Sequence, residues 1–211
     1  MPENMTLSTL EPIHKPLLPV LFMVDTSGSM AGERIDCVNE ALHEFISCTH
    51  WQKADYPYDL KVALIRFDTQ AEIMTEDFPS VFDFPVLPPL GAGGMTNLAD
   101  ALRRADELLA HLPYHRPNPR IMKPLIILIT DGYPTSPWEG KLQLLEQCNR
   151  FWAHSCKYAV ILGYDLDRDL AVRITHREDA VYMIGDDRMY PNVLTELFCS
   201  TIMGDYLVQD G

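Results

Sequence analysis

The sequence predicts an α/β fold, a doubly wound and mostly parallel sheet of six strands with helices on both faces. Apolar runs alternate with helical stretches of about 10–16 residues, which is typical of βαβ units. The runs at 20–24 and 124–130 are continuously apolar, as expected for strands buried on both faces. Only three residues separate 60–67 from 71–74, so we expect a hairpin that places an antiparallel strand at one edge. Right-handed crossovers then favour the strand order 3-2-1-4-5-6.

The remaining elements follow from the spacing of apolar residues. Strands are expected at 20–24, 60–67, 71–74, 124–130, 158–163 and 181–184. Helices are expected at 33–48, 97–112, 142–153, 167–175 and 192–203. Four prolines and three glycines make 77–94 an irregular crossing loop. We therefore divide the chain into an N-terminal arm (1–18), one domain (19–204) and a C-terminal tail (205–211).

The composition excludes several classes of function. With 17 basic and 30 acidic residues the net charge is −13, which argues against a nucleic-acid binder. The longest apolar run, 17–24, is far short of the ~20 residues that span a bilayer, so no membrane segment is expected. The five cysteines are odd in number and form no CxxC pair, and 1–16 lacks the features of a signal peptide. We expect reduced thiols and a cytoplasmic protein.

Three short polar segments fall where this fold binds ligands. In an open α/β sheet the ligand crevice lies beyond the carboxyl ends of the strands, where the strand order reverses. Asp25, Ser27 and Ser29 follow the first strand, and Asp131 follows the fourth. Thr96 stands just before the second helix, whose N-terminus should face the same crevice. Two carboxylates and three hydroxyls make a hard oxygen site that suits Mg²⁺, with Mn²⁺ or Ca²⁺ as alternatives.

These residues resemble the metal site of a known family. The run Asp25–Ser29 matches the D-x-S-x-S signature of von Willebrand factor A (VWA) domains and integrin I domains, and Thr96 and Asp131 stand where that family has its other two site residues. The resemblance covers about residues 19–203. The PVLFMVDTSGSM and GAGGMTNL segments are most similar to the small cytoplasmic bacterial members associated with tellurium resistance and stress response.

The resemblance implies a metal ion-dependent adhesion site (MIDAS) and a binding function without catalysis. Ser27, Ser29 and Thr96 would contact the ion directly, while Asp25 and Asp131 would act partly through waters. An Asp or Glu of a partner protein would complete the coordination. The resemblance also suggests a kinase, a phosphatase or another member of a stress-response operon as that partner. Because the net charge is −13, the partner should be basic overall or expose its acidic residue locally.

Simpler interpretations exist for each segment taken alone. Asp25 or either serine could cap a helix or satisfy a turn, Thr96 or Asn97 could be an ordinary N-cap, and Asp131 with the following glycine is a common turn. Tyr133 and Trp138 either pack over the loop as a lid or form the rim of a partner contact. His43 and His111 are expected at the surface or as satisfied core residues.

Two other functions compete with a binding module. A metal-dependent phosphohydrolase would use a D-x-D pair, but Ser27 stands at the second position and no His or Lys lies in the three loops. A scaffold whose metal only rigidifies the loops would melt at a much higher temperature with metal and would contact no acidic partner residue.

Overall fold

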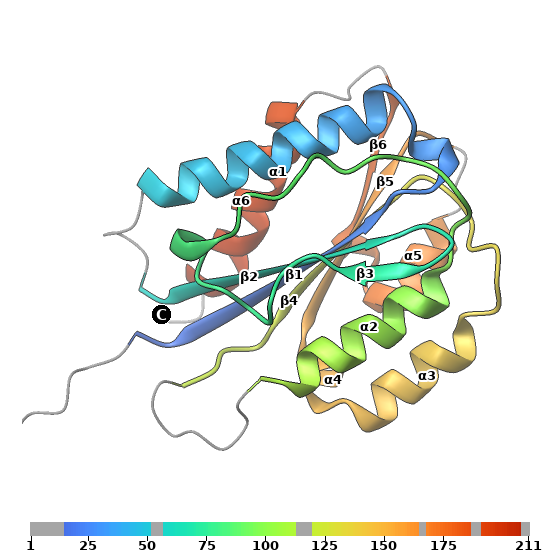
Figure 1. The fold of residues 1–211 in the computed structure, drawn as a ribbon. Coiled ribbons are helices and arrows are strands. Elements are labelled where there is room, and N and C mark those ends of the chain that lie inside the picture. Colours follow the sequence, from blue (N-terminus) through green and yellow to red (C-terminus); the bar gives the residue numbers. More distant parts are fainter. Residues whose placement is uncertain (1–14, 52–56, 113–119, 165–167, 187–190, 208–211) are drawn as a thin grey trace, which may run out of the picture.

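Six strands form one sheet in the order β3-β2-β1-β4-β5-β6 (Figure 1). The computed structural model describes residues 15–51, 57–112, 120–164, 168–186 and 191–207. The strands are β1 (Leu17–Asp25), β2 (Asp59–Phe67), β3 (Ala71–Ile73), β4 (Leu125–Thr130), β5 (Cys156–Leu162) and β6 (Val181–Ile184). All neighbours are parallel except β2 and β3, which pair antiparallel with Phe67 opposite Ala71. The predicted order and the antiparallel edge strand are confirmed.

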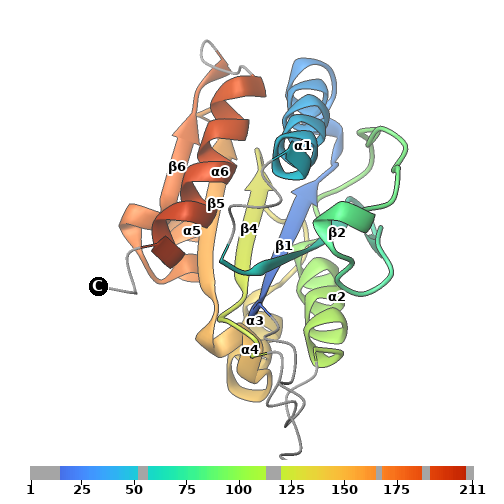
Figure 2. The same cartoon turned by 90° about the vertical axis from the view of Figure 1, so that its left-hand side faces the viewer.

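Helices cover both faces of the sheet. They are α1 (Glu33–Trp51), α2 (Leu98–Ala110), α3 (Glu139–Cys148), α4 (Arg150–His154), α5 (Arg168–Thr175) and α6 (Pro191–Leu207), with short 3-10 turns at Gly28–Met30, Val81–Asp83 and Glu178–Ala180. The helices α1 and α6 lie together on one face, and α2 to α5 lie on the other (Figures 1 and 2). No helix in the described ranges is both long and apolar enough to cross a membrane.

Strand side chains alternate between two cores, as the period of two in a strand requires. In β1, Val20, Phe22 and Val24 face the core beneath α1 and α6, while Leu21 and Met23 face the core beneath α2 to α5. The first core contains three edge-to-face phenyl rings, from Phe22, Phe45 and Phe198, with centroids 5.1–6.3 Å apart. Two buried faces explain why the β1 sequence is continuously apolar.

One helix differs from its prediction. The stretch expected as a single helix at 142–153 is two helices, because the backbone of Asn149 is extended (φ −100°, ψ 106°). The Asn149 side chain accepts a hydrogen bond from the Trp152 amide at 3.0 Å and so caps α4. Its amide group also donates to Asp106 at 2.7 Å. Apolar spacing continues through the break, so periodicity alone could not locate it.

Candidate metal centre

Asp25 and the serines of the first segment lie at the carboxyl end of β1. Asp25 ends the strand and is fully buried, with its Oδ1 accepting the Ser27 amide at 2.8 Å. Ser27 is buried and Ser29 is exposed, and their hydroxyl oxygens are 3.2 Å apart. The tight turn brings three oxygen-bearing side chains, at alternate positions, to one end of the sheet.

The end of β4 meets the same turn. Because Val24 pairs with Ile129, the next residues along the two strands come side by side. The Thr130 hydroxyl donates to Asp25 Oδ2 at 2.6 Å, and the Ser29 hydroxyl donates to Asp131 Oδ1 at 2.7 Å. Side-chain hydrogen bonds therefore link these residues across more than 100 positions of sequence.

Backbone hydrogen bonds hold the third segment against the first. The Gly28 amide donates to the Gly94 carbonyl at 3.1 Å, and the Gly93 amide donates to the Thr26 carbonyl at 2.8 Å. Gly94 has a positive φ of 79°, and a Cβ there would lie 2.6 Å from Thr69 Oγ1, so only glycine fits.

Thr96 follows this glycine turn and faces the serines. A Cβ built on Gly132 would lie 3.5 Å from Ser29 Oγ and 3.9 Å from Thr96 Oγ1, which places both hydroxyls on one side of Gly132. The neighbouring Asn97, and not Thr96, caps α2, because its side chain accepts from the Asp100 amide at 3.2 Å. Among the residues that the structure describes, the Thr96 hydroxyl has no hydrogen-bond partner. A capping role therefore does not account for it.

Asp25 carries a buried charge without a cation beside it. Its partners are a hydroxyl and an amide, and no basic side chain of the described residues forms an ion pair with it. Burial raises the pKa of Asp25 to about 6, although the hydrogen bonds from Thr130 and Ser27 act to lower it. A carboxylate in such a place favours an external cation.

Asp131, by contrast, is paired with an arginine that the sequence analysis missed. Arg34 Nη1 lies 2.6 Å from Asp131 Oδ2, and Arg34 Nε and Nη2 each donate to Asp186 at 3.1 Å. The hydrogen bonds to Asp186 and Asp131 raise the pKa of Arg34, which keeps it charged. A Cβ on Gly163 would lie 2.6 Å from Arg34 Nη2, so this glycine makes room for the guanidinium.

A signal for this arginine existed in the sequence. Arg34 lies in the first turn of α1, where the helix dipole disfavours a cation and acidic residues are normally preferred. A basic residue at that position, five residues after Ser29, indicates a nearby anion. Asp186 follows β6, and it therefore lies at the same edge of the sheet as Asp131.

The two aromatics predicted for a contact rim lie in different surroundings. Tyr133 is 55% exposed, two residues after Asp131. Trp138 is 6% exposed and belongs to the core beneath α2 to α5, with the Arg173 guanidinium 5.0 Å from its ring centre. Of the pair, Tyr133 is exposed to solvent and Trp138 packs against the fold.

The donor set fits a hard divalent cation better than zinc or copper. The residues brought together offer carboxylate and hydroxyl oxygens, which Mg²⁺, Mn²⁺ and Ca²⁺ accept. The described residues contain no group of three or more His, Cys, Asp or Glu side chains arranged to hold a metal. None of the five cysteines, all of which lie in the described ranges, forms a disulfide. A site here would therefore depend on its hydroxyls, with an unpartnered Thr96 and an unpaired Asp25 as the groups that gain most from an ion.

Comparison with known proteins agrees with this architecture. The inter-alpha-trypsin inhibitor heavy chain H1 of Mesocricetus auratus is 27% identical over 159 residues, a match that spans 70% of this chain and 16% of that protein. A von Willebrand factor type A protein from Catenulispora acidiphila superposes with a TM-score of 0.63 at 17% identity, covering 89% of this chain and 42% of the other. Proximal thread matrix protein 1 from the mussel byssus, with a zinc-occupied MIDAS motif, superposes with a TM-score of 0.57 at 15% identity, covering 89% and 47%.

These structural matches establish the fold, and the chain spans less than half the length of each of these proteins. The sequence profile described as "von Willebrand factor type A domain" matches residues 20–134, more than half of the chain. This range contains the segments that carry Asp25, Thr96 and Asp131. The chain therefore belongs to the von Willebrand factor type A domain family.

Proposed function

We propose that this domain binds a partner protein through one divalent cation, which Ser27, Ser29 and Thr96 contact directly and Asp25 and Asp131 hold partly through waters. VWA domains are commonly metal-dependent protein-interaction modules. The observation that carries the proposal for this chain is the convergence of hydroxyl and carboxylate oxygens from three segments on one end of the sheet. Asp25, buried and without a basic partner, is the charge that the cation would balance.

The native ion in this proposal is Mg²⁺, with Mn²⁺ and Ca²⁺ as alternatives. Mg²⁺ accepts oxygen ligands in octahedral geometry and retains several waters, which suits a site with two water-bridged carboxylates. Zinc fills the MIDAS motif of the mussel byssus protein. Imidazole and thiolate ligands favour zinc, and the residues that converge here offer neither.

The ligand that completes the site would be an Asp or Glu of the partner. Neutral hydroxyls leave much of the ion's charge uncompensated, and Arg34 already offsets the charge of Asp131. A hollow of about 440 Å³ opens beside Ser29, lined also by Ala31, Glu33, Arg34 and Asp186, and it leaves Ser29 open to solvent. Because the chain carries a net charge of −13, the approach of that side chain requires a partner that is basic around it.

We propose that the domain acts in a bacterial stress-response or tellurite-resistance system. The resemblance of residues 19–30 and 91–98 to small bacterial tellurium-resistance and stress-response proteins supports a cytoplasmic role in such a system. A kinase or a phosphatase is the partner class that this resemblance favours. Binding is proposed in place of phosphoester hydrolysis because Ser27 occupies the position of a second acid and the donors of Arg34 are engaged by Asp131 and Asp186.

Affinity capture from the native lysate, with Mg²⁺ or with EDTA, tests the proposal. Wild-type protein should capture a partner only with Mg²⁺, and Ser27→Ala should capture none while its circular dichroism spectrum is unchanged. Ser200→Ala, an exposed serine on α6, is the matched control and should behave as wild type. Capture that survives both EDTA and Ser27→Ala would remove the metal from the mechanism. A metal-dependent rise in melting temperature without metal-dependent capture would favour the scaffold interpretation.

A further inference from the structure

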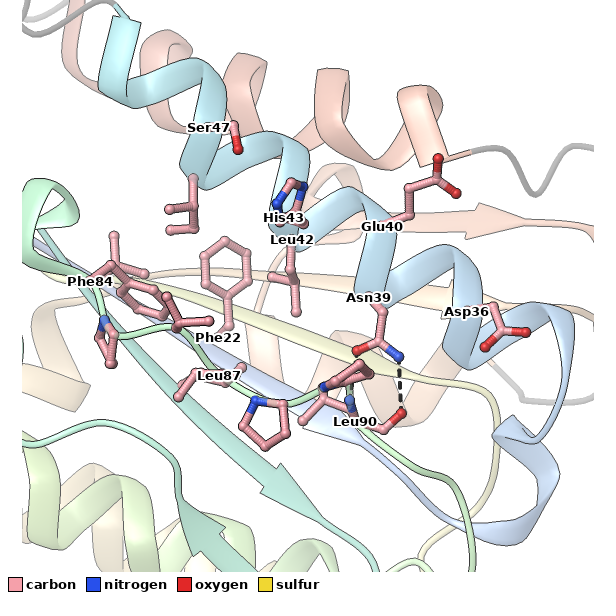
Figure 3. A pocket seen from close by; sticks show the side chains of 17 residues that line it. Phe22, Asp36, Asn39, Glu40, Leu42, His43, Ser47, Phe84, Leu87 and Leu90 are labelled. Atoms are coloured by element: carbon pink, nitrogen blue, oxygen red, sulfur yellow. Dashed lines mark hydrogen bonds between the residues drawn. The ribbon is translucent and has the colours of Figure 1, made fainter.

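A second candidate site lies away from the metal crevice, between α1 and the segment 84–90. A cavity of about 620 Å³ separates the helix from this segment, and its floor is the sheet surface of Phe22, Val62 and Leu64 (Figure 3). Pockets of about 300–1,000 Å³ are the usual size for small ligands. The cavity therefore has the size of a binding site.

The walls of the cavity are mostly apolar. The contributing side chains, besides the floor, are Leu42 and Ile46 of α1 and Phe84, Pro85, Val86, Leu87, Pro88, Pro89 and Leu90 opposite them. Phe84 lies near one end, and the other end is closed where the Asn39 side chain donates to the Leu90 carbonyl at 2.9 Å and accepts the Leu90 amide at 2.8 Å (Figure 3). Val86 is fully exposed, so the segment turns an apolar side chain to solvent. The irregular backbone of 84–90 thus stands away from the helix and leaves the space open.

The charged side chains that line the cavity are acidic. Asp36 and Glu40 lie on α1 toward the end closed by Asn39 (Figure 3). Neither carboxylate forms an ion pair with any residue in the described part of the chain. Lys and Arg are absent from the lining residues that the structure describes, and His43 is the one lining side chain that can become positive. Three prolines in 84–90 remove backbone donors from the opposite wall.

We infer that this cavity binds a small amphipathic cation, an apolar body carrying a protonated amine or a quaternary ammonium group. The apolar body would bury itself against Phe22, Leu42 and Leu87, where exclusion of water is favourable. The cationic end would lie at the rim beside the exposed Asp36 and Glu40, which have no ion-pair partner among the described residues. An amphipathic carboxylate of the same shape would meet these acids with a like charge and should be rejected. The inference is independent of the metal site.

Three isosteric probes test the inference. 2-(1-Naphthyl)ethylamine, 2-(1-naphthyl)ethanol and 1-naphthylacetate share an apolar body and differ in charge. Each is titrated into the ¹⁵N-labelled full chain at pH 8 in EDTA, so that histidine is neutral and the carboxylate probe cannot bind through a metal. The amine should shift amide signals of α1 and 84–90, and should bind about fivefold to tenfold more tightly than the carboxylate, with the alcohol between them.

Variants separate the two parts of the site. Leu42→Trp fills the cavity and should abolish binding of all three probes, while Leu144→Trp, at an exposed position of α3, should leave it unchanged. The double variant Asp36→Asn with Glu40→Gln should bind the three probes equally. Glu196→Gln, an exposed acid on α6, should keep the preference for the amine.

Several results would overturn the inference. These are equal binding of the three probes by wild type, binding that Leu42→Trp leaves intact, or no amide shifts in α1 and 84–90 at millimolar amine. A dimer of the wild type that Leu42→Trp dissociates, without probe binding, would assign the cavity to a second copy of the chain instead. All of these outcomes leave the proposed metal-dependent function unaffected.

Discussion

The carboxyl ends of β1 and β4 each present a buried aspartate, yet the two charges are balanced in different ways. Asp25 is 0% exposed, and among the described residues its hydrogen-bond donors are neutral groups of Thr130 and Ser27. Asp131 is 2% exposed and lies 2.6 Å from the guanidinium of Arg34. Two aspartates that look equivalent in the sequence therefore have different electrostatic needs.

This difference indicates which of the two aspartates lacks a balancing positive charge in the metal-free protein. Arg34 supplies a permanent cation that pairs with Asp131 in the absence of metal. Asp25 has no such cation, so its burial destabilises the metal-free fold and raises its pKa to about 6. In the proposed site, a divalent cation would therefore stabilise the end of β1 most, whereas the end of β4 is already held by the Arg34–Asp131 ion pair.

The largest expected effect is on metal affinity. Asp25→Ala should reduce Mn²⁺ binding, measured by electron paramagnetic resonance, at least about a hundredfold, because it removes a buried carboxylate that has no basic partner among the described residues. Glu196→Ala, which removes an exposed acid on α6, should leave the affinity unchanged. Affinities of the Asp25→Ala variant and wild type within about twofold would contradict the distinction between the two aspartates.

Loss of Arg34 should have the next largest effect, on stability. Arg34→Gln leaves Asp131 buried without its counter-ion and should lower the free energy of unfolding in EDTA by about 3 kcal/mol. Mg²⁺ should recover part of this loss by replacing the missing positive charge. The control is Arg66→Gln, which breaks an exposed pair with Glu72 and should cost less than about 1 kcal/mol. Equal losses in the two variants, measured by urea unfolding, would show that Arg34 acts as an ordinary surface cation.

A smaller effect of opposite sign is expected for Asp25→Asn. Because the pKa of Asp25 is about 6 in the folded protein and 3.8 ordinarily, the charged form is disfavoured by folding. The stability penalty is present in full above pH 6, decreases as the pH falls, and is absent below about 3.8. In EDTA at pH 7.5 the variant should be more stable than wild type by about 2 kcal/mol, and the difference should shrink at pH 4.5. A pH-independent difference in urea unfolding would refute this explanation.

The smallest effect concerns the partner contact. Tyr133→Ala should weaken partner capture about fivefold without changing metal affinity, because an exposed tyrosine beside the site can contribute contact area. Tyr164→Ala, exposed after β5, is the control. A loss of metal affinity in Tyr133→Ala would show instead that Tyr133 supports the loop.

Much of the fold could be predicted from the sequence because the central strands β1 and β4 are buried on both faces. Continuous apolar runs such as 20–24 and 124–130 then mark central strands, and the three-residue connection after Phe67 fixes the antiparallel edge. The break at Asn149 could not be predicted, since it depends on a tertiary hydrogen bond to Asp106. The cavity beside α1 also has no sequence signature, because it arises from where the irregular segment 84–90 settles.

The candidate site was predictable to the extent that strand ends share one edge of the sheet. That rule brings together Asp25 and Asp131, and hydrogen bonds now link both ends to the serines. It did not reveal Arg34, whose guanidinium reaches Asp131 from a helix, nor the burial of Trp138, which depends on its packing beneath Arg173. Strand order does not show which side chains of neighbouring helices and loops extend to the strand ends.

The most direct test of the account is the stoichiometry of Mg²⁺ binding by isothermal titration calorimetry of the EDTA-treated and dialysed chain. We expect one ion per chain for wild type and no binding for Ser27→Ala, with both proteins giving the same circular dichroism spectrum. Absence of Mg²⁺, Mn²⁺ and Ca²⁺ binding by wild type at millimolar concentration, or equal binding by Ser27→Ala, would contradict a metal centre built from these three segments.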